Sequence, residues 1–231
     1  MEDHGNIIEC RGLSLGYGQD TILEDVDLDI KAGWLLPFVG GNGAGKSTMF
    51  KALLGLLPPR RGEIRRLWGK GRPGYVPQQQ HLDPIFPVTV RKIVEMGLYS
   101  ECGFLCWLSR AQKERLESTL ERFGLTEHQE KTFGELSGGL RQKTLIARAV
   151  IGQAEVIFLD EPVAGLDAAS EESTLRMLID LNTKHGKTIL LAHHRLEDLS
   201  RLSPRVCMVN RGKVEILPSD VAFRKLHGGA Q

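Results

Sequence analysis

The chain of 231 residues lacks any apolar run that approaches the roughly 18 residues of a membrane-spanning helix. It also lacks a charge excess, because 30 basic and 29 acidic residues leave a formal net charge of +1. Such a balance gives no electrostatic footprint for nucleic acid. The first ten residues are acidic and polar, whereas a secretory signal begins basic and continues apolar. We therefore expect a cytoplasmic chain that reaches a membrane only through a partner.

The four cysteines do not form a metal-binding pattern. Only Cys102 and Cys106 lie close in sequence, and a structural zinc site needs a second close pair of ligands. Free thiols are therefore expected. A second candidate metal cluster consists of His185, His193 and His194. The last two end a strand-like apolar run, which favours a different role for His193.

The first third of the chain alternates apolar and polar residues, which indicates strands. Three such runs occur, at residues 7–17, 21–30 and 35–39. Pro37 is unexpected in the third run, because proline cannot donate to a strand ladder. A helix is expected over residues 46–54, with Gly55 and the prolines after it as the stop signal.

Helical spacing dominates from about residue 88, where Ser109 and Gln112 form a capping-box signal. We expect a helical subdomain at 88–150, inserted between two core segments, 1–87 and 151–231, of a single domain. Strand and helix alternate again after this insertion. The expected elements are strands at 156–160 and 188–192, a helix at about 168–184, a hairpin around Gly212 and a short terminal helix.

One basic cluster stands out in this otherwise balanced chain. It consists of Arg60, Arg61, Arg65 and Arg66. Without a wider charge excess, such a cluster is typical of a solvated turn, and we expect a turn here.

Residues 40–48, GGNGAGKST, lie between an expected strand and an expected helix. Glycines let the backbone approach phosphate oxygens, Lys46 can reach the β and γ phosphates, and the Ser47 hydroxyl can ligate Mg²⁺. The alternative is a flexible turn with a surface lysine. The strand, loop and helix order favours a nucleotide site. Its expected members are Gly40, Gly41, Asn42, Gly43, Ala44, Gly45, Lys46, Ser47 and Thr48.

An acidic pair, Asp160 and Glu161, follows the buried apolar run 156–159. The carboxyl ends of strands are the edge where open α/β sheets bind ligands. Asp160 is therefore suited to hold Mg²⁺, directly or through water. A general base at Glu161 would need to lie within about 3 Å of the water that it polarises, or one bridging water away. The alternative is an acidic turn before Pro162.

A second glycine-rich helix start, LSGGL, occupies residues 136–140. Free backbone N–H groups and the positive end of the helix dipole attract anions there, and the Ser137 hydroxyl can cap the helix. A plain helix cap is the alternative. The chain therefore offers two phosphate-binding surfaces.

These motifs together resemble the nucleotide-binding subunit of an ATP-binding-cassette (ABC) transporter, over about residues 13–217. The resemblance implies an α/β fold: a P-loop NTPase core with an antiparallel β subdomain and an inserted α-helical subdomain. It also implies an ATPase that uses ATP and Mg²⁺ and works as a head-to-tail dimer of two copies. Each ATP would lie between the Lys46 loop of one chain and the Ser137 helix of the other.

Several residue roles are implied only by this resemblance. In the family, the residues at Leu136, Ser137, Gly138 and Gly139 contact ATP on the opposite subunit. Leu140 departs from the family, which usually has glutamine there, although Gln142 follows two residues later. Asp167, in AGLD, matches the loop that crosses the dimer interface.

Four further residues match the family's catalytic and base-binding positions. Glu161 resembles the general base, and Gln78 resembles the glutamine that meets Mg²⁺ and the attacking water. His193 resembles the histidine that holds the γ-phosphate, although its flanking residues differ from the usual Thr-His-Asp. Tyr17 resembles the aromatic residue that stacks on adenine, and the alternative is an ordinary strand aromatic.

The resemblance also implies partners. They are a transmembrane permease at the cytoplasmic face of the membrane and, through the complex, an extracytoplasmic solute-binding protein. Residues 81–97 and 108–128 resemble the same segments in the ATP-binding subunits of importers of zinc, manganese or iron. They also resemble, less closely, those of ferric-chelate importers. The alternatives are another cargo, or a soluble ABC protein acting on nucleic acid or the ribosome. A phosphate-binding module without turnover is disfavoured, because Glu161 and His193 are both present.

Overall fold

The computed structural model describes residues 5–69, 71–78, 87–101, 107–193, 202–210 and 212–227. The strands are β1 (Asn6–Tyr17), β2 (Asp20–Lys31), β3 (Leu35–Val39), β4 (Arg61–Arg66), β5 (Gly74–Val76), β6 (Val156–Asp160), β7 (Thr188–His193), β8 (Arg205–Asn210) and β9 (Lys213–Pro218). The α-helices are α1 (Lys46–Leu53), α2 (Val90–Met96), α3 (Arg110–Arg122), α4 (Gly138–Ile151), α5 (Ala168–Thr183) and α6 (Ser219–His227). In this part of the chain, three short 3₁₀ turns lie at Tyr99–Glu101, Thr126–His128 and Phe133–Glu135.

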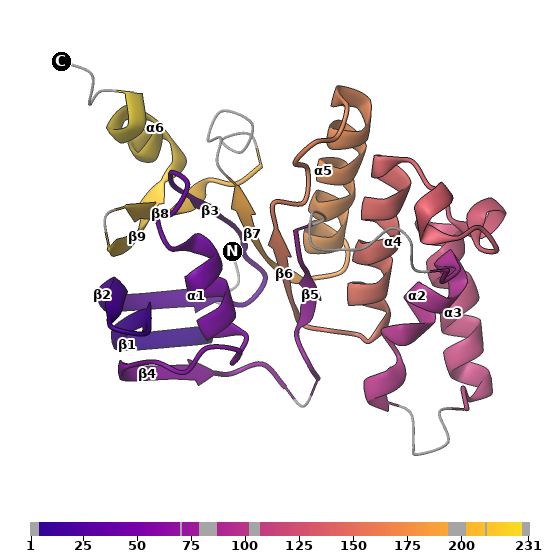
Figure 1. The fold of residues 1–231 in the computed structure, drawn as a ribbon, viewed down its shortest axis with the longest axis horizontal. Coiled ribbons are helices and arrows are strands. Elements are labelled where there is room, and N and C mark those ends of the chain that lie inside the picture. The colour runs from indigo at the N-terminus through magenta and orange to yellow at the C-terminus, as the bar shows by residue number, and fades with distance from the viewer. Residues whose placement is uncertain are drawn as a thin grey trace.

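Two sheets organise the described residues (Figure 1). The larger has the order β5-β6-β7-β3-β8-β9, with parallel pairing up to β8 and an antiparallel hairpin at β8–β9. The smaller sheet, β2-β1-β4, is antiparallel throughout. The predicted α/β class with an antiparallel subdomain is confirmed.

The larger sheet is buried on both faces, because neighbouring residues of its strands point into different cores. In β3, Leu35 and Val39 join a core with the helices α2 to α5, whereas Leu36 and Phe38 join a core with α1 and the smaller sheet. Strands β6 and β7 alternate in the same way, as the period of two residues requires. Helices α1 and α4 therefore pack on opposite faces of one sheet.

The helical block on the right of Figure 1 contains α2, α3 and α4. Helix α3 begins with the predicted capping box, in which Ser109 and Gln112 each bond the other's backbone N–H. This exchange satisfies two N–H groups that the helix itself leaves without partners. The boundaries proposed for the helical subdomain, 88–150, stay a prediction.

The predicted solvated turn at the basic cluster is wrong. Residues 61–66 form β4, an edge strand that pairs with β1 over five residue positions from Ile8 to Ser14. The segment RGEIRR has little apolar alternation, because an edge strand with one exposed face needs only Ile64 to pack inward. The guanidinium of Arg66 is also held, by the carbonyls of Leu53 and Ala52 at the end of α1.

Pro37 lies within β3, between β7 and β8. The ladder with β7 runs through all five residues of β3, but the ladder with β8 begins only at Phe38. The missing N–H of proline is tolerated best where a ladder has not yet begun. Within the described ranges, no helix is long and apolar enough to cross a membrane.

Candidate nucleotide-binding site

The loop at residues 40–45 joins β3 to α1 and wraps around the side chain of Lys46. The ammonium group donates hydrogen bonds to the carbonyls of Gly40 at 2.7 Å and Gly41 at 3.0 Å. Only 7% of Lys46 is exposed, and burial lowers its pKa while the charges of Glu161 and Asp160 oppose that shift. The loop is therefore closed around a cation before any ligand arrives.

Glycine is required at two positions of this loop. Gly45, the N-cap of α1, has φ +105°, and a Cβ there would lie 2.9 Å from Leu23 Cδ2. A Cβ on Gly40 would lie 2.1 Å from the carbonyl oxygen of Val209 in β8. Gly41, Asn42 and Gly43 are exposed, Ala44 is half-buried, Ser47 is exposed and Thr48 is buried. The exposed part of the loop is thus free to meet a ligand.

The two predicted magnesium ligands of the loop and β6 meet directly. The Ser47 hydroxyl donates to Asp160 Oδ1 at 3.4 Å. Burial raises the pKa of Asp160, whereas the hydrogen bond from Ser47 lowers it. Two oxygen side chains thus face one another at the end of β6, which is the ligand chemistry that Mg²⁺ prefers.

Glu161, the predicted base, is held by three contacts. Its carboxylate Oε2 accepts a hydrogen bond from Gln78 Nε2 at 2.8 Å, its backbone N–H donates to Ala192, and its carbonyl accepts from Ala164. The residue has φ +50°, a conformation that non-glycine residues rarely adopt. Strain of this kind persists where surrounding contacts impose it and clusters at functional sites.

His193 reaches the same edge of the sheet. It ends β7, is 1% exposed, and aligns with Val39 at the end of β3. Asp160 aligns with Ala192, one residue before it. The register of three neighbouring parallel strands therefore brings the phosphate loop, the acidic pair and His193 together. His194, Cys102 and Cys106 lie outside the described residues.

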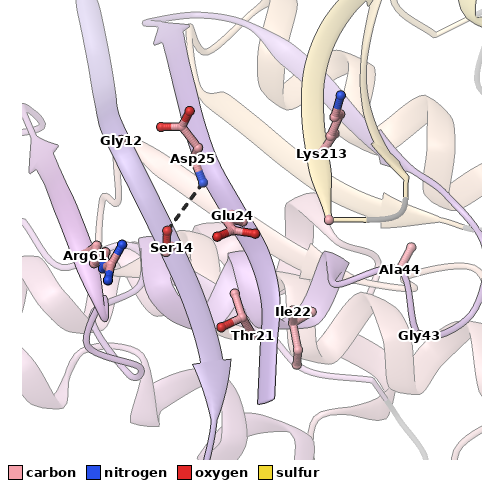
Figure 2. A pocket seen from close by; sticks show the side chains of 11 residues that line it. Gly12, Ser14, Thr21, Ile22, Glu24, Asp25, Gly43, Ala44, Arg61 and Lys213 are labelled. Atoms are coloured by element: carbon pink, nitrogen blue, oxygen red, sulfur yellow. Dashed lines mark hydrogen bonds between the residues drawn. The ribbon is translucent and has the colours of Figure 1, made fainter. Parts of the chain in front are cut away.

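Tyr17 ends β1 and is 44% exposed, and the ammonium of Lys51 on α1 lies 5.7 Å from its ring centroid. An open pocket of about 960 Å³ is lined by residues of the smaller sheet, the phosphate loop and the β8–β9 hairpin (Figure 2). Its lining residues are Gly12, Ser14, Thr21, Ile22, Glu24, Asp25, Gly43, Ala44, Arg61, Gly212 and Lys213. Residues of strand β2 and of the phosphate loop therefore line the same pocket.

The LSGGL segment divides into exposed and buried residues. Ser137 and Gly138 are exposed, and the Ser137 hydroxyl accepts the backbone N–H of Leu140 at 3.4 Å as the cap of α4. Leu136 and Gly139 are buried. A Cβ on Gly139 would lie 2.6 Å from Ser170 Oγ, so glycine at this position permits α4 to approach α5.

Leu140 and Gln142 occupy different environments. Leu140 is half-buried and packs against the helical core, whereas Gln142 is 1% exposed inside α4. Gln142 therefore does not replace the glutamine that the family usually has at position 140, because its side chain is buried.

Asp167 caps α5, and sequence reasoning did not anticipate this. Its carboxylate accepts hydrogen bonds from the backbone N–H of Ser170 at 2.9 Å and from its hydroxyl at 2.8 Å. These bonds hold the pKa of Asp167 below its ordinary value. An aspartate directly before a helical run is a cap signal that could have revealed this contact.

Arg148 is a second residue that the sequence did not single out. It lies on α4, burial lowers its pKa, and its guanidinium donates to the carbonyl of Tyr75 at 3.3 Å. This contact links α4, the helix that Ser137 caps, to β5, the strand that leads to Gln78. In the described residues, no group of three or more His, Cys, Asp or Glu side chains is arranged to hold a metal ion.

Comparisons with known proteins agree with this geometry. The family model described as ABC transporter matches residues 23–164. The zinc transport system ATP-binding protein TroB of Treponema pallidum is 38% identical over 208 residues, which are 88% of this chain and 78% of that protein. The manganese transport system ATP-binding protein MntB of Bacillus subtilis is 34% identical over 233 residues, covering 96% of this chain and 92% of that protein.

Solved structures of ABC transporter proteins are also similar to this chain. An inward-facing metal-chelate type ABC transporter has a TM-score of 0.85 at 27% identity, over 94% of this chain and 85% of that chain. The dimeric post-hydrolysis state of the cassette MJ0796 with ADP and Pi has a TM-score of 0.77 at 25% identity, over 92% and 98% of the two chains. The fold and the site define a P-loop ATPase. The chain belongs to the ABC transporter family, as one of its ATP-binding and ATP-hydrolysing subunits.

Proposed function

We propose that this chain hydrolyses ATP to energise the import of a divalent metal ion, zinc or manganese, through a membrane permease. The observation that carries the cargo assignment is 34–38% identity to zinc and manganese transport ATP-binding proteins over most of the chain. Iron or a metal chelate is the next candidate, supported by the fold similarity to a metal-chelate type transporter.

For nucleotide binding, we assign residues 40–48 to the phosphates. Lys46 is a buried cation, and its ammonium donates to two backbone carbonyls that phosphate oxygens can replace. Ser47 and Asp160 suit Mg²⁺, because their oxygens already lie 3.4 Å apart at the strand edge. Bound Mg²⁺ would neutralise charge on the phosphates. Gln78 is close enough to Glu161 to contribute a further oxygen.

For hydrolysis, we assign Glu161 as the general base. Its carboxylate is oriented by Gln78 at 2.8 Å, and its backbone is tied to the end of β7. Oriented in this way, it can accept a proton from the attacking water. His193, at the same edge, would hold the γ-phosphate, and Tyr17 would stack on adenine.

We further propose a head-to-tail dimer of two copies. Ser137 and Gly138 are exposed at a helix N-terminus, and α4 packs on the face of the sheet opposite to α1. A second copy would let this helix start meet the ATP bound at the Lys46 loop of the first. The homologous cassette MJ0796 is dimeric with ADP and Pi. Asp167 would lie near the same interface.

The proposed complex contains transmembrane permease subunits, with this chain bound to them at the cytoplasmic face of the membrane. An extracytoplasmic solute-binding protein would deliver the metal. Binding of the γ-phosphate would favour the closed dimer and hydrolysis would release it, so that nucleotide drives the permease through differential affinity for two states.

The test is uptake by the reconstituted complex. The permease that co-purifies with the chain is placed in vesicles with ATP, and zinc, manganese and iron uptake are compared. ATP-dependent uptake of zinc or manganese is expected, and the Glu161→Gln complex should show none. Uptake of neither metal, with intact ATPase activity, would overturn the cargo assignment. Binding of nucleic acid without any co-purifying membrane subunit would favour a soluble ABC protein.

A further inference from the structure

The turn between β1 and β2 carries the aromatic ring proposed to stack on adenine. Tyr17 is the last residue of β1 and Asp20 is the first of β2, so two residues, Gly18 and Gln19, make the connection. The ring is 44% exposed at this edge of the smaller sheet. A partly exposed ring on a two-residue turn needs outside contacts if its orientation is to be fixed before a ligand binds.

Arg60 supplies such contacts. Its guanidinium donates to the carbonyl of Gly18 at 2.6 Å, to the carbonyl of Gln19 at 3.3 Å and to the Thr21 hydroxyl at 3.2 Å. Its backbone N–H donates to the carbonyl of Ser14 at 2.9 Å. One side chain therefore ties together the residues that follow Tyr17, while its backbone is fastened to the strand that precedes it.

Lys51 acts on the ring itself. Its ammonium lies 5.7 Å from the ring centroid of Tyr17, within the range of a cation–π contact. A cation over one face leaves the other face of the ring available to a base. Lys51 also belongs to α1, the helix that begins with Lys46, so the ring is tied to the helix of the phosphate loop.

Strand β2, which follows this turn, lines the open pocket in Figure 2. Thr21, which Arg60 contacts, lines this pocket beside Ile22, and Gly43 and Ala44 of the phosphate loop line its other side. The hydrogen bond from Arg60 to Thr21 therefore also holds one residue of this pocket wall.

We infer that Arg60 is a positioning residue for the base of the nucleotide: it holds the β1–β2 turn and thereby presents the ring of Tyr17 for stacking. The inference rests on the proposed nucleotide-binding function. Arg60 acts on the base through Tyr17, and it leaves the binding of the triphosphate unchanged. The arginine that charge patterning placed in a solvated turn thus contributes to nucleotide affinity.

The experiment compares a ligand with a base to one without. ATP hydrolysis is measured for Arg60→Gln, together with inhibition by inorganic tripolyphosphate. The KM for ATP should rise about fivefold, since pre-organisation of a binding group is lost. The kcat should stay within about twofold, because the lost interaction is made equally in ground and transition states. Inhibition by tripolyphosphate should not change. Arg60→Lys should recover part of the affinity.

Arg65→Gln is the matched control, because Arg65 belongs to the same cluster and makes an exposed ion pair with Glu63 at 2.9 Å. It should behave as the unmodified chain. The second measurement combines Arg60→Gln with Tyr17→Ala. If Arg60 acts through the ring, its effect on KM should vanish in the Tyr17→Ala background.

Three outcomes would overturn the inference: an unchanged KM in Arg60→Gln, equal weakening of ATP and tripolyphosphate, or a full Arg60 effect in the absence of the Tyr17 ring. Failure of the proposed function looks different. In that case the unmodified chain would not hydrolyse ATP, or Tyr17→Ala would leave the KM for ATP unchanged.

Discussion

The two glycine-rich helix starts of this chain, at residues 40–48 and 136–140, differ in the side-chain contacts that the same chain makes around them. At the first, the loop of 40–48 encloses Lys46, Ser47 meets Asp160, and Gln78 meets Glu161. At the second, the Ser137 hydroxyl caps its own helix, and Ser137 and Gly138 are exposed. The first site is assembled within one chain. In the proposed dimer, the second helix start would meet the ATP bound to the other copy.

The difference also separates two uses of glycine. In the phosphate loop, Gly45 adopts a left-handed conformation that only glycine adopts readily. In the second segment, Gly139 is buried and permits α4 to approach α5, while the neighbouring Gly138 remains exposed. The two adjacent glycines thus differ: Gly139 serves helix packing inside the chain, whereas Gly138 lies at the surface.

The largest effect is expected from Glu161→Gln, which tests whether the first site is catalytically complete. Turnover should fall about 10²- to 10⁴-fold, the usual contribution of a general base. Nucleotide binding should survive, because glutamine retains the shape of the side chain and a hydrogen bond with Gln78. An ATP-dependent dimer should accumulate in size measurements. Hydrolysis at the normal rate would remove Glu161 from the role of base.

Ser137→Arg tests the second helix start alone. A bulky cation at the exposed cap should block closure, so the ATP-dependent dimer and most of the turnover should be lost. One-sided nucleotide binding by the Lys46 loop should persist within about threefold, since Lys46 is held by its own loop and Ser47 by Asp160 within the same chain. Arg65→Gln serves as a surface control. An unchanged ATP-dependent dimer, measured by light scattering, would contradict the shared site.

Gly139→Ala and Gly138→Ala form a pair that separates the two tasks of glycine. The added methyl of Gly139→Ala would lie 2.6 Å from Ser170 Oγ, and we expect destabilisation of about 1–3 kcal/mol, as for an overpacked core. The methyl of Gly138→Ala would lie 3.2 Å from a flexible end of Leu166 and should cost less. Denaturant unfolding measures both. Combined with Ser170→Gly, Gly139→Ala should cost less than it does alone, when each is compared with its own parent, and an equal cost in both backgrounds would assign it elsewhere.

The sequence predicted those parts of the fold that rest on periodicity and on end signals. Strand β6, helix α5 with its end before Gly186, and the capping box of α3 all follow from local patterns. Strand β4 could not be found in this way, because RGEIRR has no clear alternation and pairs along an edge only because β1 is present. Tertiary pairing decided its structure.

The same limit applies to the candidate site. The phosphate loop and the acidic pair are contiguous in sequence, so their chemistry could be read directly. The hydrogen bond from Gln78 to Glu161 joins residues 83 positions apart, and the contacts of Arg60 depend on a turn about 40 positions away. The left-handed conformation of Glu161 is likewise imposed by its neighbours. Long-range contacts of this kind leave no local pattern.

The smallest expected effect concerns the charge of Asp160 and its contribution to the stability of the nucleotide-free chain. Burial raises the pKa of Asp160, so the folded chain binds its proton more tightly than the unfolded chain does. The ionised form therefore costs stability above the raised pKa, and this cost disappears as the pH falls below 3.8, where both states are protonated. The charges of Lys46 and Lys51 reduce the cost, whereas that of Glu161 increases it.

Asp160→Asn should consequently raise the free energy of unfolding of the nucleotide-free chain at pH 7. The gain should stay under about 1 kcal/mol, because solvent screens a side chain that is only partly buried. Urea unfolding at pH 7 and at pH 4 measures it, and the gain should shrink at the lower pH. The same variant should lose Mg²⁺-dependent hydrolysis. A variant less stable than the unmodified chain at pH 7 would mean that the charge of Asp160 stabilises the folded chain, so that the nearby lysines and the Ser47 hydrogen bond outweigh the cost of burying it.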